Sequence, residues 1–315
     1  MRPDQGSFPF TDDHGTIWLA FTDWGNRMLP RTMICAHGLT RQGRDFDALA
    51  RVIGRNIRCV ETDVVGRGRS NWLNNKDGYN FETYLRHADA LLGYRGLQEV
   101  EWLGTSMGGI IGMLLASREG TPIKRLILND VGPFIPKAAL ERIGSYVAEP
   151  PVFQNLNEAG AYLRETLADF GDLSDADWSE MTQHSVIREP DGTYKMHYDP
   201  AIGDAFEGPI NDVDLWAVYD MIKCPTLVLR GANSDLLPRE VAEEMTERGP
   251  KADLIEFEGC GHAPALMDEA QIGAVHEWLM QFEPVEEEDE DMPAEMSTKA
   301  ETSTNVADGT SSDAS

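Results

Sequence analysis

Ser106 lies in the run GTSMG, with one glycine two residues before it and another two residues after it. The apolar segments VEWL and IIGMLL flank this run, which predicts a buried strand, a sharp turn and a buried helix. Such a turn strains the backbone of the serine and exposes its hydroxyl, and side chains at the two glycine positions would clash in it. The alternative is that Ser106 is only a small turn residue. Whether it is a nucleophile depends on whether the sequence also offers a base and an acid to act with it.

A serine nucleophile needs a base, and the base needs an acid that orients it. His262 is the candidate base, because it lies in the loop GCGHAP directly after the apolar strand DLIEF. Two acids also follow strands, Asp235 after TLVLR and Asp130 after RLIL. We prefer Asp235, since its strand is the more usual carrier of the acid when the chain order is serine, acid, histidine. Asp130 is the alternative, and capping of the following turn is its other explanation.

Acyl transfer through a serine also needs two backbone N–H groups that bind the oxyanion of the tetrahedral intermediate. The amide of Met107, directly after the serine, is one candidate. The amide of Leu39 is the other, because it follows His37 and Gly38 at the end of the predicted strand TMICA. We expect Gly38 to permit the backbone path and the His37 side chain to be structural.

The elements that must position these residues alternate along the chain. Seven strands are predicted, over residues 16–21, 32–36, 57–62, 99–103, 125–129, 226–230 and 253–257. Helical patterns separate them, over residues 46–54, 81–94, 107–117, 238–248 and 269–282. This alternation indicates a mostly parallel sheet flanked by helices, whose strands end on the edge where such sheets build their sites. From 134 to 213 the alternation stops and helical patterns predominate, which predicts an insertion between two core strands.

Composition narrows the classes of function. The chain has 315 residues and a formal net charge of −27, which argues against nucleic-acid binding and against binding to an anionic membrane surface. Residues 284–315 are acidic and almost devoid of apolar side chains, so we predict a disordered tail there. The four cysteines show neither CxxC spacing nor the repeated Cys/His clustering of a zinc site, so no metal and no cofactor are expected. Without a leader pattern or a long apolar run, the protein is expected to be cytoplasmic, as a monomer or homodimer.

Taken together, these motifs resemble the α/β-hydrolase superfamily. The matching features are HG at residues 37–38, D-x-x-G-x-G-x-S from Asp63 to Ser70, G-x-S-x-G, the late aspartate and the terminal G-H. The resemblance implies an eight-stranded, mostly parallel sheet, formed by residues 1–133 and 214–283, with a helical cap from 134 to 213 inserted after strand six. It also implies a structural role for the Asp63–Arg67 loop, with contact to substrate as the alternative.

The resemblance further implies a serine hydrolase that cleaves carboxylic esters of small or medium acyl groups through Ser106, His262 and Asp235. The runs GTSMGGIIGM and LNDVGPFIPKAAL are similar to a bacterial branch of carboxylesterases and intracellular hydrolases of 3-hydroxybutyrate oligomers. A carbon–carbon hydrolase of meta-cleavage products is an alternative, and Arg41 is the candidate cation for its carboxylated substrates. A non-catalytic binding protein is the remaining alternative, although the complete set of serine, acid and histidine disfavours it.

Overall fold

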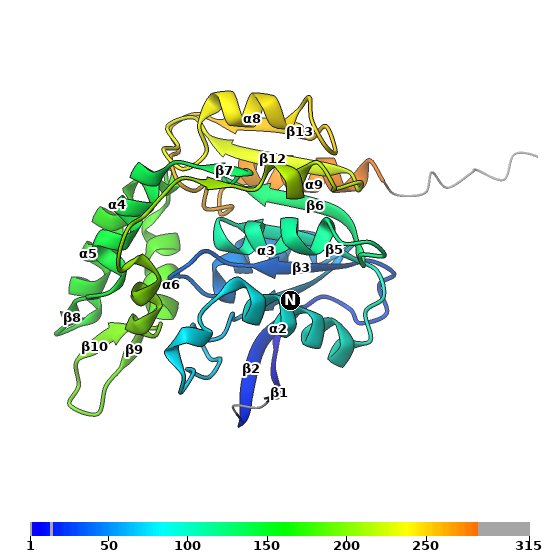
Figure 1. Ribbon diagram of the computed structural model, residues 1–315. Coiled ribbons are helices and arrows are strands. Elements are labelled where there is room, and N and C mark those ends of the chain that lie inside the picture. Colours follow the sequence, from blue (N-terminus) through cyan, green and yellow to red (C-terminus); the bar gives the residue numbers. More distant parts are fainter. Residues whose placement is uncertain (1, 13–14, 283–315) are drawn as a thin grey trace, which may run out of the picture.

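The computed structural model describes residues 2–12 and 15–282, so the predicted acidic tail at 284–315 lies outside the described residues (Figure 1). Eight strands form the main sheet, in the spatial order β1 (Asp4–Asp12), β2 (Gly15–Trp24), β4 (Arg58–Thr62), β3 (Thr32–Ala36), β5 (Val100–Thr105), β6 (Ile123–Asn129), β12 (Thr226–Gly231) and β13 (Asp253–Phe257). The pairs β1–β2 and β2–β4 are antiparallel and all the other pairs are parallel. The predicted eight-stranded, mostly parallel sheet is therefore confirmed.

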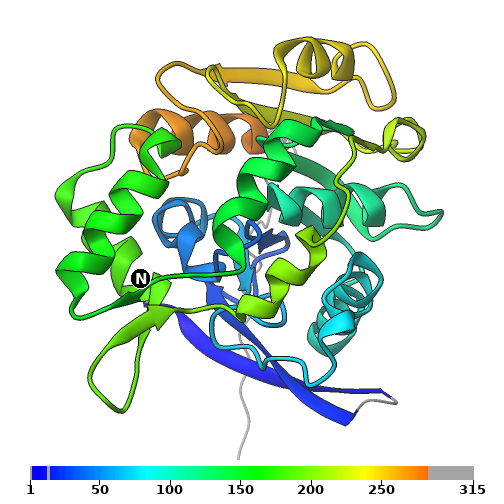
Figure 2. The ribbon, with the colours of Figure 1, turned by 60° about the vertical axis from the view of Figure 1, so that its left-hand side comes forward.

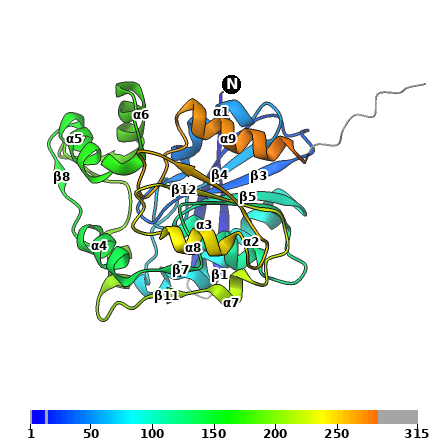
Figure 3. The same ribbon diagram turned by 90° about the horizontal axis from the view of Figure 1, so that it is seen from above.

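Helices cover both faces of this sheet (Figure 3). On one face lie α1 (Asp47–Ile53) and α9 (Glu269–Met280), and on the other lie α2 (Phe81–Arg95), α3 (Met107–Ala116) and α8 (Arg239–Met245). The side chains of β3 alternate between the two cores, since Met33 and Cys35 pack with α1 and α9 whereas Ile34 packs with α2 and α3. Burial on both faces favours apolar side chains along a strand, which explains the apolar run from Met33 to Ala36.

The eighth strand, β1, was missing from the sequence-based prediction. It pairs with β2 in an antiparallel hairpin from Asp4↔Asp23 to Asp12↔Gly15, at the edge of the sheet. Its sequence DQGSFPFTD contains Pro9, which cannot donate a ladder hydrogen bond and therefore fits an edge strand. Phe8 and Phe10 are the apolar positions that pack on the core, and two aromatic residues beside a proline give little strand signal.

His87 of α2 packs edge-on against Phe10, with 4.5 Å between the ring centroids. Burial lowers the pKa of His87 to about 4. Between the ordinary histidine pKa of about 6.5 and pH 4, the unfolded chain therefore binds more protons than the native state, and stability falls as the pH falls. We expect His87→Phe to remove up to about 1.4 kcal/mol of this loss per pH unit in that window. Urea unfolding of both proteins at several pH values from about 7 to 4 checks this, and parallel curves would contradict it.

The segment between β6 and β12 stands apart from the sheet, in green in Figure 1 and turned forward in Figure 2. Its helices are α4 (Lys137–Val147), α5 (Leu156–Thr166), α6 (Asp175–Ser185) and α7 (Trp216–Tyr219). It also holds two small sheets, one of β8 (Val152–Phe153), β10 (Tyr194–Met196) and β9 (Val186–Arg188), the other of β11 (Val213–Asp214) and β7 (Phe134–Ile135). Strands of two or three residues are too short for an alternating pattern, so only the helices of this segment were predictable from sequence.

The ends of this segment meet, because Val213 pairs with Ile135 and Asp214 pairs with Phe134. Short 3₁₀ turns complete the connections, namely η1 (Gly43–Phe46), η2 (Lys76–Gly78), η3 (Ala168–Phe170) and η4 (Pro200–Phe206). Within the described residues, no helix combines the length and the apolar character that crossing a membrane requires.

Candidate functional site

Ser106 lies between the end of β5 and the start of α3, with φ 52° and ψ −117°, a conformation that side chains rarely adopt. The two flanking glycines are required because a side chain at either position would clash with the backbone. A Cβ at position 104 would lie 2.2 Å from the carbonyl oxygen of Gly108, and a Cβ at Gly108 would lie 2.0 Å from the carbonyl oxygen of Ala36. The predicted strand, turn and helix are therefore present, and the turn is as tight as the spacing of the glycines indicates.

His262 connects the serine to an acid. Its Nε2 is 3.0 Å from Ser106 Oγ and its Nδ1 is 2.7 Å from Asp130 Oδ2. A carboxylate only accepts hydrogen bonds, so Nδ1 carries the proton and donates it to Asp130, and Nε2 is left to accept the hydroxyl hydrogen of Ser106. The geometry thus joins Ser106, His262 and Asp130 in one hydrogen-bonded chain.

Asp235, the acid preferred from sequence, is not part of this chain. Its carboxylate accepts from Nη2 of Arg142 on α4 at 2.8 Å, and about half of its side-chain surface is exposed. The hydrogen bond that Arg142 donates to Asp235 raises the pKa of Arg142. The expectation that Asp235 orients His262 is therefore corrected in favour of Asp130, the alternative acid.

The reason for this correction lies in how the neighbouring loop holds Asp130. The Asp130 side chain is fully buried at φ 54°, and its Oδ1 accepts from the amide of Gly231 at 2.9 Å. Its Oδ2 accepts from Ser234 Oγ at 2.6 Å as well as from His262. In the loop after β12, the Ser234 side chain thus points toward Asp130, whereas the next residue, Asp235, points toward Arg142.

Sequence reasoning missed two residues that help to build the site, Ser234 and Asn129. Asn129, at the end of β6, donates from Nδ2 to Thr105 Oγ1 at 3.0 Å and to the carbonyl of Pro264 at 2.9 Å. It thereby ties the residue before the serine to the loop that carries the histidine. The available signal was their position at strand ends next to the candidate acids, in LILND and GANSD.

The two amides predicted to bind an oxyanion belong to Leu39 and Met107. Within residues 2–12 and 15–282, neither N–H donates a hydrogen bond to another group of the protein. Gly38 is less constrained than expected, because a Cβ there would meet Ser106 Cβ at 3.7 Å, an ordinary contact.

His37 is buried and bridges two segments of backbone. Its Nδ1 lies 2.7 Å from the Gly38 carbonyl, and its Nε2 accepts from the amide of Val64 at 3.0 Å. Burial lowers the pKa of His37 to about 3, so the ring is neutral over the physiological range. These contacts agree with the structural role predicted for this side chain.

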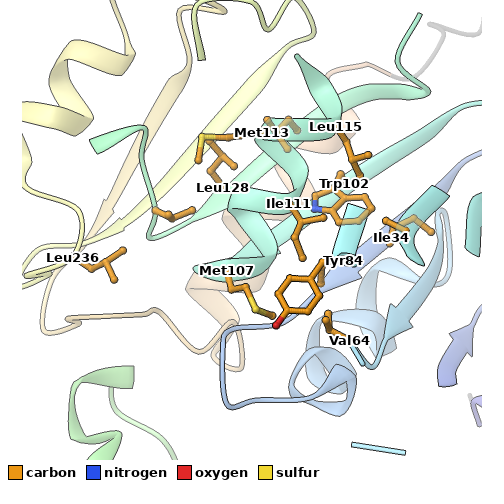
Figure 4. Packing of buried hydrophobic residues seen from close by; sticks show 14 of the residues in the cluster. Ile34, Val64, Tyr84, Trp102, Met107, Ile111, Met113, Leu115, Leu128 and Leu236 are labelled. Carbon is orange, nitrogen blue, oxygen red and sulfur yellow. The ribbon is translucent and has the colours of Figure 1, made fainter. Parts of the chain in front are cut away.

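A cavity of about 290 Å³ opens next to Ser106. Its walls come from the core and from the segment between β6 and β12, and they are mostly aliphatic and aromatic: Leu39, Tyr79, Asn80, Phe81, Tyr84, Met107, Ile110, Ile135, Leu140, Ile143, Ile202, Ala205, Phe206 and Leu236. Figure 4 shows Met107 and Tyr84 side by side at the core wall of this cavity. No charged side chain lines it among the described residues.

Arg41, the candidate cation for a carboxylated substrate, is already paired. Its Nε and Nη2 each donate to the carboxylate of Asp45 at 2.7 Å, and its Nη1 donates to Ser185 Oγ at 2.9 Å. The side chain is buried by these contacts and does not line the cavity beside Ser106.

One group within the described part of the chain has the spacing of a metal site, namely Asp47, Glu180 and His184, whose ligand atoms lie within 4.8 Å of one another. Both carboxylates already accept hydrogen bonds from guanidinium groups, Asp47 from Arg44 and Glu180 from Arg51. The positive charges that these carboxylates need are thus supplied by the chain itself.

The comparisons with known proteins agree with the fold described above. The sequence model of the alpha/beta hydrolase family matches residues 33–275. A 3-hydroxybutyrate-oligomer hydrolase of Cupriavidus necator is 40% identical over 264 residues, which are 81% of this chain and 90% of that protein.

Solved structures agree as well. A structure from Rickettsia typhi has a TM-score of 0.83 at 35% identity, covering 89% of this chain and 99% of that one. An alpha/beta hydrolase of Novosphingobium aromaticivorans has a TM-score of 0.80 at 32% identity over the same shares, 89% and 99%. With the eight-stranded sheet and the serine turn described above, these matches show that the chain belongs to the alpha/beta hydrolase family.

Proposed function

We propose that this protein hydrolyses carboxylic esters through a covalent acyl-enzyme on Ser106. The observation that carries the proposal is the hydrogen-bonded chain from Ser106 through His262 to Asp130, beside an apolar cavity. His262 Nε2 takes the hydroxyl proton as Ser106 Oγ attacks the ester carbonyl carbon. Asp130 keeps the proton on Nδ1 and stabilises the imidazolium that forms.

The amides of Leu39 and Met107 bind the carbonyl oxygen as it becomes an oxyanion. When the tetrahedral intermediate collapses, the bond to the alcohol breaks and His262 gives its proton to the leaving oxygen. Water then attacks the acyl-enzyme, with His262 again accepting a proton, and the acid is released as Ser106 recovers its hydrogen.

The cavity indicates the substrate class. A volume of about 290 Å³ equals roughly ten water volumes, and its apolar wall suits an uncharged acyl or alcohol group of small to medium size. Residues 134–213, which supply Ile135, Leu140 and Ile143 to the wall, act in this proposal as a cap that selects the substrate. The 3-hydroxybutyrate-oligomer hydrolase among the relatives makes oligomers of short hydroxyalkanoates the first esters to test.

A panel of 4-nitrophenyl esters from acetate to decanoate, with a dimer and a trimer of 3-hydroxybutyrate, tests this proposal. We expect turnover that peaks at a medium chain length and includes the oligomers. A coloured meta-cleavage product should not bleach, because its carboxylate would find no cation in the cavity wall. Bleaching without ester turnover would instead support a carbon–carbon hydrolase, and no turnover of either class would support a binding protein.

Leu140 offers a test of the cavity as the acyl or alcohol site. It is half-buried on α4 and its side chain faces the cavity, so Leu140→Phe should fill part of the space. We expect kcat/KM for the octanoate ester to fall about tenfold, within the range for mismatched pocket volume, while the acetate ester changes little. Leu156→Phe on α5, which does not line this cavity, is the matched control. Equal losses on both esters would contradict a role in chain-length selection.

Ser234 is expected to support the acid. Ser234→Ala removes the hydrogen bond of 2.6 Å to Asp130 Oδ2, which leaves that oxygen with His262 as its remaining partner. The carboxylate should become less well fixed, and we expect kcat to fall about tenfold. This factor corresponds to roughly 1.4 kcal/mol, close to the contribution of one hydrogen bond to a charged group. KM should change little, because Ser234 does not line the cavity. A kcat equal to that of the unchanged protein would show that Asp130 needs no such support.

A further inference from the structure

Arg67 lies in the loop between β4 and α2, and its side chain is fully buried. Its guanidinium contacts both segments that carry the oxyanion-binding amides. Nε donates to the carbonyl of Leu39 at 2.7 Å, and Nη2 lies 3.5 Å from Met107 Sδ. Nη1 donates to the carbonyl of Val65 at 2.8 Å and to the hydroxyl of Tyr84 at 3.0 Å.

No carboxylate pairs with this guanidinium among the described residues. The other three buried arginines each have one, since Arg41 pairs with Asp45, Arg58 with Asp23 and Arg230 with Glu256. Two ring faces near Arg67, those of Tyr79 and Tyr84, lie 5.8 and 5.1 Å from its guanidinium carbon. A buried charge without a counter-charge is costly, so its retention at this place needs a reason.

The loop that carries Arg67 is itself held firmly. Asp63 accepts from the amides of Gly43 and Arg69, and a Cβ at Gly68 would lie 2.6 Å from the Asp63 carboxyl carbon. Arg67 also forms a backbone bridge to Tyr198, in the segment between β6 and β12. The guanidinium is thus fixed in place by contacts that do not depend on a ligand.

We propose that Arg67 is a positioning residue for the oxyanion site, and that its uncompensated positive charge favours the anion that forms there. This inference rests on the proposed ester hydrolysis. By binding the Leu39 carbonyl and the Met107 sulfur, Arg67 keeps the two amides aimed at one point, and no substrate contact is required of it. When Ser106 Oγ bonds to the carbonyl carbon, one electron pair moves to the carbonyl oxygen, and the field of the buried Arg67 cation, acting through the segments of Leu39 and Met107 that it contacts, favours this new negative charge.

The test separates stabilisation of the anion from binding of a neutral ligand. Butylboronic acid bonds to Ser106 Oγ, whose proton passes to His262, and the boron becomes a tetrahedral anion like the intermediate. N-phenylbutyramide serves as the neutral competitor. For Arg67→Met we expect kcat on 4-nitrophenyl butyrate to fall about 100-fold, as when one oxyanion donor is lost. The inhibition constant for the boronic acid should rise by a similar factor, while that for the amide changes less than about threefold.

Arg67→Lys keeps the charge without the forked geometry, so its losses should be intermediate. Arg58→Met is the matched control, because it removes a buried arginine whose partner is Asp23; it should lower stability and leave kcat unchanged. Equal weakening of both inhibitors by Arg67→Met, or no change in kcat, would overturn the inference. If Arg67→Met does not fold, Tyr84→Phe decides, since it removes one acceptor of Arg67. Tyr84→Phe should lower both kcat and the affinity for the boronic acid. No change in either quantity would overturn the inference.

Failure of the inference about Arg67 is distinguishable from failure of the proposed function. If the proposed function were wrong, the unchanged protein would show no ester turnover that depends on Ser106. Failure of the present inference would instead appear as Ser106-dependent turnover that is insensitive to Arg67.

Discussion

Replacing Ser106 with alanine is expected to reduce hydrolysis of 4-nitrophenyl butyrate by about 10⁴- to 10⁶-fold, the range seen when a serine nucleophile is removed. The residual rate would come from the oxyanion site and from binding alone. Folding should be unaffected, because alanine has the same Cβ as serine and meets the same strain at φ 52°. The measurement combines steady-state kinetics with thermal unfolding of both proteins.

Labelling provides an independent readout of the same prediction. A fluorophosphonate should modify Ser106 in the unchanged protein and leave Ser106→Ala unmodified. Ser117→Ala is the matched control, since Ser117 lies directly after α3 and donates to the carbonyl of Leu114, away from the site. Undiminished ester turnover in Ser106→Ala would reject the proposed mechanism, and turnover in the unchanged protein without labelling would reject Ser106 as the residue attacked.

The second large effect distinguishes the two candidate acids. Asp130→Asn should lower kcat by about 10⁴-fold, as expected when a carboxamide replaces the carboxylate and stabilises the wrong tautomer of the histidine. The amide group of asparagine can donate to Nδ1, which moves the ring proton to Nε2 and prevents that atom from accepting the serine hydrogen. Asparagine also tolerates the positive φ of 54° at this position, so the backbone should survive the change.

Asp235→Asn is the matched control. It breaks an exposed ion pair with Arg142, and such pairs contribute about 0–1 kcal/mol to stability. We expect kcat to stay within about threefold of the unchanged protein, because Asp235 does not contact His262. A large loss of kcat in Asp235→Asn with a small loss in Asp130→Asn would restore the sequence-based preference.

Much of the fold was predictable because its signals are local. Apolar runs of five or six residues marked seven of the eight strands, and the break in alternation at 134–213 marked the segment whose ends are joined by Val213 and Ile135. The prediction missed β1, whose alternation is interrupted by Pro9 at the sheet edge. It also missed the two- and three-residue strands between β6 and β12, which owe their pairing to neighbours in space.

Ser106 and His262 were predictable for the same reason. Each was recognised by its place in the loop after a predicted strand. The glycines at 104 and 108 also indicated the tight turn at Ser106, because a Cβ at either position would clash with the backbone. The oxyanion role proposed for the amides of Leu39 and Met107 was likewise predicted from that turn and from the loop after β3.

The identity of the acid depended on tertiary structure. Asp130 and Asp235 both follow strands that are neighbours in the sheet, β6 and β12, so chain order and strand position do not separate them. The separation comes from which side chain points inward, and that depends on Ser234 and Gly231 donating to Asp130 while Arg142, from the segment between the two strands, binds Asp235.

Arg67 and Arg41 show the same dependence on tertiary structure, since both are arginines in loops after strands. From sequence, Arg41 was the candidate cation, whereas a structural role was expected for the loop of Arg67. Arg41 is neutralised by Asp45, four residues along the chain, whereas Arg67 is buried without an acid and reaches Leu39 and Met107 from distant segments. The sequence by itself thus determined seven of the eight strands of the main sheet, the serine turn and the histidine loop, because these depend on residues close along the chain. Only the tertiary structure decided which acid contacts the histidine and which buried arginine is left without an acid, because these contacts depend on side chains brought together from several loops.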